Sequence, residues 1–559
     1  MSFFKAKLWD ALTTGRGLAI LQTSVFVAGF LCLALVSLRL GPLVDYDVKN
    51  YHYYAGYAFL NGRIDVDYAP AQIQSFLNPL SFVPFYLLAT NTAPMTTGFV
   101  LGGIHGLAVG LVFLIVFALF PSMAALPRIA LSLACALLGV YAPAFISLLG
   151  GSFNGSLLNL FVLLSVYLMI RVITRDGESD SRSGIKYILL AGLLMGLAVG
   201  LKLTNSIFLV GISVATLAAG SIWRSRLKAA AWLAAAAVAG IIISRGFWMA
   251  KLWSKFDSPI FPFYNKIFHS PYYYDKNIVD TRLLPKTIGD AFLWPFSFLT
   301  SPPWNPDRYF RDSRYAVVYV LLILCLVYLA ARYLRGRRRA AAATAQTRCT
   351  ANPAAGARTF LVVFFAVSYV LWQTQFSIMH YALTLEMFAP AVAAILIVTM
   401  LRGRYLRLGA IVLALGIIAV VMRPIQSHRG TWSSSYVHVE APMFDRPGDT
   451  LVIFADNQPW SYVIPFFQPE VRFVGLLSNF SHTMQATGGV RHEATRAMLD
   501  MVKAHDGPIF VLSNATRIRA TLSSLEEMDI VLKSDRCIMV QSEHEKYPLC
   551  LWPVEVKAR

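Results

Sequence analysis

Long apolar segments alternate with short basic loops along the first 422 residues of the chain. A transmembrane helix needs roughly 20 residues to cross about 30 Å of hydrocarbon, and eleven segments fit this description. They are 17–39, 96–120, 128–149, 154–174, 187–201, 205–223, 228–249, 313–334, 359–376, 383–401 and 405–422. The pattern predicts a polytopic α-helical membrane protein with about eleven transmembrane helices.

The basic residues predict which loops face the cytoplasm. Lys and Arg concentrate in the loops 121–128, 171–186, 224–228, 335–358 and 402–407, which share one side if the N-terminus is cytoplasmic, as the positive-inside rule requires. Two shorter apolar segments, Phe76–Leu88 and Ala291–Leu299, contain Pro. If only one of them crossed the bilayer, the basic loops that follow it would face outward, so both are expected to lie on the outer face as juxtamembrane segments.

The last part of the chain has a different pattern. Residues 1–422 are expected to form the membrane domain with outer loops 40–95 and 250–312, and 423–559 a small α/β domain outside the membrane. Short β-type runs, Thr450–Ala455 and Pro508–Leu512, flank a helical stretch, His492–Ala504. In an oxidising compartment Cys537 and Cys550 are expected to form a disulfide, with two unpaired thiols as the alternative.

Composition supports a membrane protein. Hydrophobic residues make up 57% of the 559 and charged residues 14%, whereas soluble proteins carry about 25% charged residues. The net charge of +19 would suggest nucleic acid in a soluble protein. Here much of the excess lies just beyond apolar segments, where it orients helices and meets anionic lipid headgroups, so no nucleic-acid partner is expected.

The first outer loop combines carboxylates with aromatic residues. Asp45 and Asp47 follow the first helix, and tyrosines and a histidine follow within ten residues. Residues 48–60 fit a short amphipathic helix whose N-terminus would favour an ionised Asp47. Such a carboxylate, walled by rings, suits removal of a proton from an acceptor hydroxyl. The alternative is that both carboxylates cap a helix and that the tyrosines form an interfacial belt.

Three cations occupy outer positions where the positive-inside rule disfavours them. Lys202 ends the run GLLMGLAVGLK, and Arg245 and Lys251 lie at the outer end of the seventh helix. Beside a carboxylate-rich loop they favour recognition of a phosphate, whose departure cations stabilise. The alternative is that they snorkel to the membrane surface.

Two further clusters offer groups for a substrate. The second outer loop contains Tyr264, Asn265 and Arg282 among many aromatic residues, a composition that suits sugar rings or an isoprenoid chain. It is equally typical of an ordered interfacial loop. His380 and Glu386 lie near the outer start of the tenth helix, where an ionised Glu386 needs a partner; Arg245 or His380 would serve structurally.

The first outer loop resembles the GT-C class of glycosyltransferases, which use polyprenyl-phosphate-linked sugars. In relatives such as protein mannosyltransferases and the aminoarabinose transferase of lipid A, an Asp precedes an aromatic residue by four positions and a Gly by about fifteen. Asp47, Tyr51 and Gly62 match this spacing, and Asn78–Pro79–Leu80 stands where a Pro-containing segment follows. Among these relatives, the loop resembles the mannosyltransferase-like family 87 more closely. Val48 replaces the usual second acidic residue.

The resemblance implies an inverting-type transferase with Asp47 as the general base and Asp45 as an assisting carboxylate. Lys202, with Arg245 and Lys251, would bind the donor phosphate. The residues expected to contact substrate are Tyr51, His52, Tyr54, Gln72, Asn78, Tyr264, Asn265, Arg282, His380 and Glu386. The partners implied are a polyprenyl-phosphate-linked sugar donor, membrane lipids, and a glycan, lipid or protein acceptor.

Several points stay open in the sequence. The sequence establishes no cofactor, and a divalent ion, Mg²⁺ or Mn²⁺, that bridges Asp45, Asp47 and the phosphate is an alternative. The expected location is a bacterial cytoplasmic membrane, with the N-terminus in the cytoplasm and the C-terminal domain in the periplasm. The rival functions are a transporter or flippase of lipid-linked glycans and a non-enzymatic envelope-assembly protein.

Overall fold

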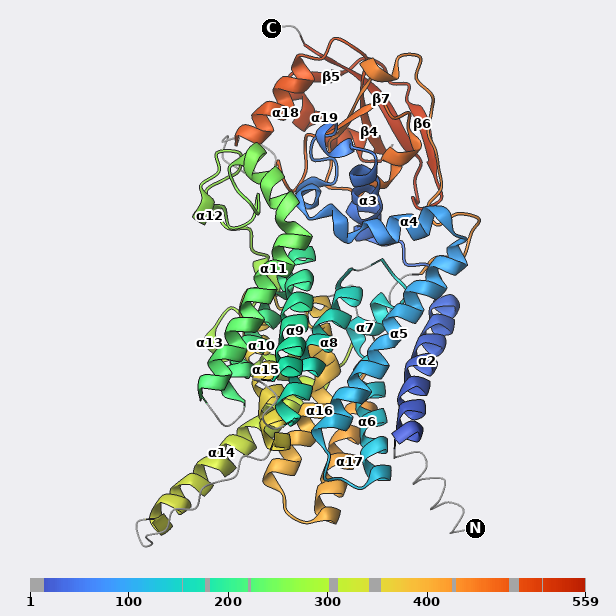
Figure 1. Ribbon diagram of the computed structural model, residues 1–559. Coiled ribbons are helices and arrows are strands. Elements are labelled where there is room, and N and C mark those ends of the chain that lie inside the picture. The colour runs from blue at the N-terminus through green and yellow to red at the C-terminus, as the bar shows by residue number, and fades with distance from the viewer. Residues whose placement is uncertain are drawn as a thin grey trace. The chain divides into compact units, whose positions relative to one another are not determined.

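The computed structural model describes residues 15–152, 154–175, 181–219, 223–300, 310–340, 353–424, 429–481, 492–514 and 516–557 (Figure 1). Parts of three predicted loops lie outside these residues, namely 176–180 of the loop 171–186, 301–309 of the loop 250–312 and 341–352 of the loop 335–358. The chain divides into two compact units. The first comprises Met1–Arg39, Phe99–Ser244 and Val279–Ser427, and the second Leu40–Gly98, Arg245–Ile278 and His428–Arg559.

Apolar helices appear at all eleven segments predicted to span the membrane. In the described part of the chain, nine helices are long and apolar enough to cross a membrane, and two shorter apolar helices accompany them. The eleven are α2 (Gly15–Leu40), α5 (Pro94–Leu119), α6 (Ala125–Val140), α8 (Asn154–Thr174), α9 (Arg182–Leu201), α10 (Ser206–Ala218), α11 (Trp223–Phe256), α14 (Arg314–Ala340), α15 (Pro353–Gln375), α16 (Leu383–Met400) and α17 (Arg404–Val421). The prediction of a polytopic helical membrane protein is confirmed.

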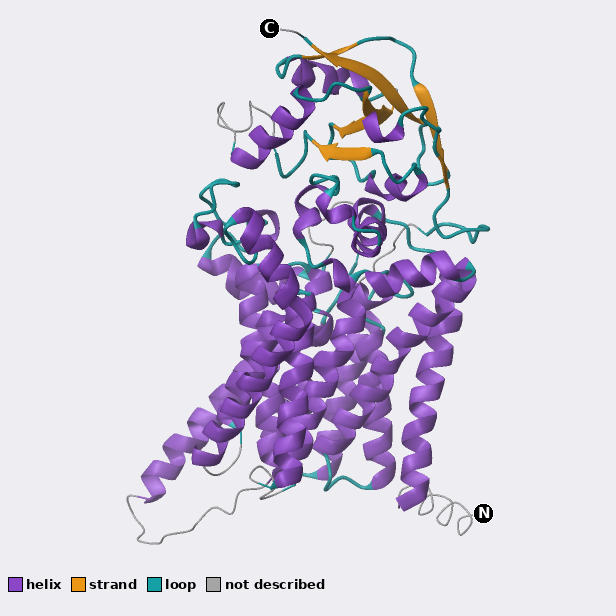
Figure 2. Cartoon of the chain, turned by 45° about the horizontal axis from the view of Figure 1, so that its top comes forward, coloured by secondary structure: helices purple, strands orange, loops and turns teal. Residues whose placement is uncertain are grey.

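The first unit is a bundle in which small residues let helices approach closely (Figure 2). A Cβ atom added at Gly106 of α5 would lie 2.1 Å from the carbonyl oxygen of Gly29 in α2. The same addition at Gly196 of α9 would lie 2.0 Å from the carbonyl oxygen of Ala237 in α11. Where lipid removes the hydrophobic drive between helices, such backbone contact is a main source of packing energy.

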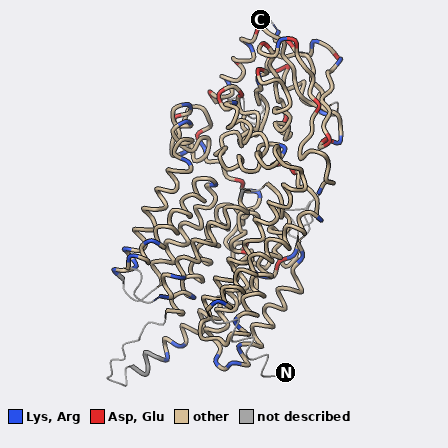
Figure 3. The backbone as a smooth tube through the Cα atoms, turned by 45° about the vertical axis from the view of Figure 1, so that its right-hand side comes forward, with Lys and Arg blue, Asp and Glu red and all other residues tan. Residues whose placement is uncertain are grey.

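Lys and Arg residues gather at one end of the bundle (Figure 3). The guanidinium groups of Arg128, Arg358 and Arg407 donate to the carbonyl oxygens of Phe117, Leu119 and Leu401 at distances of 2.7, 3.1 and 2.8 Å. Arg side chains thus satisfy carbonyl groups near helix C-termini, which have no partner within the helix. This is the end that the sequence assigns to the cytoplasm, and the assignment stays a prediction.

Two predicted boundaries differ from those observed. The segment 128–149 is divided, because α6 ends at Val140 and α7 (Pro143–Leu148) begins with a proline, which favours the first turn of a new helix. The seventh helix continues to Phe256, so the second outer loop starts later than expected. The two Pro-containing apolar segments form short helices, α4 (Val83–Asn91) and α13 (Ile288–Ser297).

The second unit contains a mixed seven-stranded sheet in the order β1-β6-β7-β4-β2-β3, with β5 paired to β7. The strands are β1 (Val439–Glu440), β2 (Leu451–Phe454), β3 (Arg472–Gly475), β4 (Ile509–Asn514), β5 (Ile530–Leu532), β6 (Ile538–Ser542) and β7 (Leu549–Val556), and the helices are α18 (Glu493–Lys503) and α19 (Ile518–Glu526). Strands β3, β2 and β4 are parallel, whereas β7 is antiparallel to its neighbours. The predicted α/β domain and its two strands and helix are confirmed.

The first outer loop packs onto this sheet. It forms the helical turn Val48–His52 and α3 (Tyr53–Leu60), and Tyr68 then pairs with β3 in parallel. The N–H of Tyr68 donates to Phe473 and the N–H of Gly475 donates to Tyr68, both over 2.9 Å. The compact units therefore differ from the predicted domains, because residues 40–98 and 245–278, including α12 (Asn265–Phe268), belong with the C-terminal sheet.

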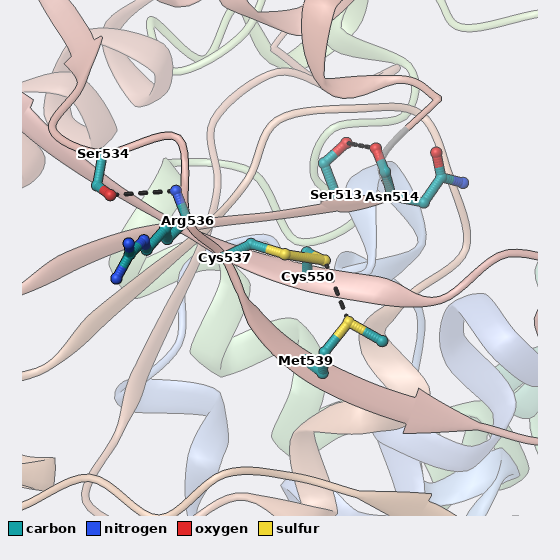
Figure 4. The surroundings of a disulfide bond; sticks show 7 residues. All are labelled: Ser513, Asn514, Ser534, Arg536, Cys537, Met539 and Cys550. Atoms are coloured by element: carbon teal, nitrogen blue, oxygen red, sulfur yellow. Dashed lines mark hydrogen bonds between the residues drawn. A yellow bond between two sulfur atoms is a disulfide. The ribbon is translucent and has the colours of Figure 1, made fainter.

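A disulfide joins Cys537, just before β6, to Cys550 in β7 (Figure 4). The two strands are antiparallel neighbours, with Met539 opposite Cys550 in the register. The crosslink therefore joins segments that the sheet already holds side by side.

Candidate active site

Asp45 and Asp47 lie in the short segment that joins α2 to the turn Val48–His52. A carboxylate oxygen of Asp45 accepts the backbone N–H of Val48 over 3.2 Å, and its carbonyl oxygen accepts the N–H of Lys49 over 3.1 Å. Asp45 therefore caps the helix, which is the structural role proposed above as the alternative to catalysis for both carboxylates. Asp47 occupies the residue before the first helical turn, but its side chain makes no capping hydrogen bond there. The half-buried carboxylate of Asp47 thus lies at a positive helix end without serving as the cap.

Tyr46 links this segment to a loop that follows β2. Its hydroxyl donates to the side-chain oxygen of Gln72 over 3.3 Å and lies 3.4 Å from the carbonyl oxygen of Asn457. The amide of Gln72 donates to the carbonyl oxygens of Asn457 and Gln458 over 3.0 and 3.3 Å. We call residues 45–47, Gln72 and 456–458 the carboxylate site.

The carboxylates of Asp47 and Asp456 both lie close enough to Tyr46 to act on its hydroxyl. The pKa of Tyr46 is raised by burial and by the carboxylates of Asp47 and Asp456, while its bond to Gln72 lowers it. Asp456 was not among the residues singled out from the sequence. Its place directly after a buried parallel strand, where ligand-binding residues of α/β sheets concentrate, was the available signal.

The predicted aromatic residues of the first loop serve mainly as its core. Tyr54 is buried and donates to Asp67 over 2.8 Å. Burial raises the pKa of Asp67, although its bonds to Arg63 oppose the shift. Tyr51 and the buried His52 both pack against Phe82, with ring centroids 5.2 and 4.8 Å away.

Lys251, Arg245 and Asn78 are among the second-unit residues proposed to bind phosphate or substrate. Lys251 pairs with Asp65 over 2.6 Å, and Lys255 pairs with the same carboxylate; these lysines lower the pKa of Asp65. Arg245 is 2% exposed. Asn78 caps a short turn through the N–H of Leu80.

In the second outer loop, the residues predicted to contact substrate are either bonded to nearby parts of the loop or exposed. The side chain of Asn265 is buried and bonds the backbone of Ser270, Tyr273 and Tyr274. Tyr264 is 43% exposed. Arg282, in the first unit, pairs with Asp280 two residues away over 2.8 Å.

In the first unit the structure brings Lys202 next to the ring of Tyr381 and the backbone of His380. The ammonium of Lys202 lies 4.9 Å from the centre of the Tyr381 ring. A Cβ atom added at Gly155, in the first turn of α8, would lie 3.0 Å from that ammonium and 3.9 Å from the carbonyl oxygen of His380. Lys202 thus adds a positive charge beside the positive end of a 21-residue helix, an arrangement that favours an anion.

Glu386 has a different partner from those expected. Arg314, at the start of α14, lies 3.4 Å from a Glu386 carboxylate oxygen and 2.6 Å from Asp312. All three side chains are fully buried. Arg314 is thus a partner of Glu386 that the sequence did not indicate, and the role of Glu386 in binding substrate stays a prediction.

Comparisons of fold find similar solved structures. The chain is similar to ArnT from Cupriavidus metallidurans bound to undecaprenyl phosphate, with a TM-score of 0.46 and 12% identity over 96% of this chain and 98% of that one. It is also similar to the oligosaccharyltransferase AglB from Archaeoglobus fulgidus in complex with an inhibitory peptide and a dolichol-phosphate, with a TM-score of 0.46 and 11% identity over 95% and 76% of the two chains. No protein-family model and no curated protein matches the chain.

Metal ligands are sparse in the described part of the chain, where no group of three or more His, Cys, Asp or Glu side chains is placed to hold an ion. Mg²⁺ needs only one or two carboxylates when phosphate and water complete its coordination. Asp45 and Asp47 would meet that number, with one Asp45 oxygen already engaged by Val48. A metal here stays a hypothesis, and the chemistry below is derived from side chains alone.

Proposed function

We propose that the protein is an integral-membrane glycosyltransferase that moves a sugar from a polyprenyl-phosphate donor to an acceptor hydroxyl. The observation that carries the proposal is that the two carboxylates have different positions at the N-terminus of the helix. Asp45 caps the helix, whereas Asp47 lies at the positive helix end beside Tyr46 and Asp456 without serving as the cap. An ionised carboxylate in that position suits a general base.

The reaction follows from this placement. Asp47 accepts the proton of the acceptor hydroxyl while the acceptor oxygen forms a bond to the anomeric carbon. The bond from that carbon to the phosphate oxygen breaks, and the polyprenyl phosphate leaves with the electron pair. Attack opposite the leaving group inverts the anomeric centre.

Lys202 is the best-supported of the three proposed phosphate-binding cations. It lies by the first turn of α8, so its ammonium and the helix N–H groups would stabilise the negative charge that develops on the leaving phosphate. Lys251, by contrast, already shares Asp65 with Lys255. The proximity of Lys202 and Asp47 remains part of the proposal.

Replacing Lys202 by Gln should raise the KM for a polyprenyl-phosphate-linked sugar about tenfold, the effect of losing one charge-assisted hydrogen bond. The measurement is release of polyprenyl phosphate by the purified protein at varied donor concentration. Lys186→Gln, at the other end of α9 where Lys186 is exposed, is the matched control and should leave KM unchanged. Equal KM values for wild type and Lys202→Gln would remove Lys202 from the donor site.

The proposal also requires the carboxylate site and Lys202 to face the same side of the membrane, the periplasm. Cysteines introduced at Tyr46 and Leu203 should both react with a membrane-impermeant maleimide added to intact spheroplasts. A cysteine at Lys186 should react only after the membrane is permeabilised. Labelling of Tyr46→Cys and Leu203→Cys from opposite sides would exclude a shared active site.

A further inference from the structure

The strand order places a switch point at the carboxyl ends of three parallel strands of the C-terminal sheet. Strand β2 lies between β3 and β4, and all three are parallel. The chain leaves β2 towards β3 on one side and returns to β4 on the other. In such sheets, ligands bind beyond the carboxyl ends of the strands at the point where the strand order reverses, which here is the gap between β2 and β4.

Two charged residues occupy that position. Asp456 lies two residues after β2 and Arg517 three residues after β4, and they pair over 2.6 Å. The Gln458 carboxamide lies within 3.2 Å of the same guanidinium, and the side chain of Asn514 accepts the N–H of Arg517 over 3.0 Å. The Arg517 side chain is 46% exposed and that of Asp456 is 13% exposed, so both can reach a ligand.

The same loop contacts the proposed catalytic segment. Gln72 donates to the carbonyl oxygens of Asn457 and Gln458, and the Tyr46 hydroxyl lies by Asn457. The switch point of the sheet and the segment that carries Asp47 therefore form one continuous surface within the second unit. Tyr46, 42% exposed, contributes an aromatic face to it.

We propose that the acceptor binds at this switch point, held by Asp456 and Arg517, and that it is a neutral, hydroxyl-rich group such as a glycan. This inference rests on the proposed function. A guanidinium beside a carboxylate offers donors and acceptors together, which suits adjacent hydroxyl groups. Arg517 already offsets the charge of Asp456, and the nearby carboxylate of Asp47 disfavours an anionic acceptor at the same surface.

Binding of simple sugars tests the proposal without turnover. The probes are methyl α-D-glucoside and methyl α-D-mannoside, titrated against the purified full-length protein in detergent micelles and followed by saturation-transfer difference NMR. We expect Asp456→Asn and Arg517→Gln each to raise Kd about tenfold for at least one of the two glycosides, with thermal unfolding checked for each variant.

Lys503→Gln is the matched control. Lys503 forms a similar partly exposed pair with Asp529 over 2.7 Å, but it lies near Pro508 and Ile509, at the amino end of β4. The Lys503→Gln variant should bind both glycosides with the same Kd as the wild type. Absence of binding to the wild type, or an equal loss in Lys503→Gln, overturns the proposal. Tighter binding of glucose 6-phosphate than of methyl glucoside overturns the inference that the acceptor is neutral.

The two proposals fail in different ways. If donor turnover depends on Asp47 but the Kd for glycosides is unchanged in Asp456→Asn and Arg517→Gln, the transferase function stands and the acceptor site is wrong. If the glycosides bind through Asp456 and Arg517 but no sugar is transferred from any polyprenyl phosphate, the sugar site stands and the transferase function is wrong.

Discussion

Asp47→Asn should lower the rate of sugar transfer by about 10²- to 10⁴-fold, the usual contribution of a positioned general base. The amide keeps the size of the carboxylate but cannot accept a proton from the acceptor hydroxyl. Because the capping bond at this helix is made by Asp45, the substitution should leave the local structure and the melting temperature nearly unchanged. The measurement is kcat for transfer from a polyprenyl-phosphate-linked sugar by the purified protein.

Asp45→Asn separates a loss of charge from a loss of structure. Asn caps helices about as well as Asp, and its side-chain oxygen can still accept the N–H of Val48. If Asp45 acts mainly as a cap, this variant should lose less than about tenfold in kcat. A wild-type rate for Asp47→Asn would remove Asp47 as the base, whereas equal large losses for both variants would assign catalysis to the carboxylate pair.

Elements with a local pattern were predictable from the sequence. The membrane helices follow from apolar length, and the strand β2 and helix α18 follow from short β-type and amphipathic patterns. The helix expected at 48–60 is observed as the turn Val48–His52 and α3, which ends at Leu60. Gly62, matched by resemblance alone, has a φ of 66°, a backbone conformation that glycine adopts without strain.

Pairings between distant segments were not predictable, because no spacing connects them. Tyr68 extends the sheet beside β3, and Arg63 donates to the carbonyl oxygen of Val471, 408 residues away. The proximity of Asp456 to Tyr46 is also a contact between distant segments that no spacing in the sequence predicts. Glu386 lies in an apolar helix, so the sequence indicates that its carboxylate needs a cation nearby. The sequence does not indicate which of several basic residues the fold places beside it.

The partner that the fold supplies, Arg314, forms the most heavily bonded ion cluster among the described residues of the first unit. Its guanidinium bonds both oxygens of Asp312 and the carbonyl oxygen of Glu386, at distances of 2.6 to 3.1 Å. The Glu386 carboxylate also accepts the N–H of Ala144 over 3.4 Å. One cation thus offsets two buried carboxylates and connects the starts of α14, α16 and α7.

Arg314→Leu should therefore destabilise the protein by about 3–5 kcal/mol, since it leaves buried carboxylates without their cation. The measurement is unfolding of the purified protein in detergent micelles. Glu386→Gln is the control: the amide oxygen can still accept the Ala144 N–H, Arg314 keeps Asp312, and the cluster becomes neutral, so we expect a loss below about 1 kcal/mol. Equal losses for the two variants would show that packing, and not charge balance, makes Arg314 necessary.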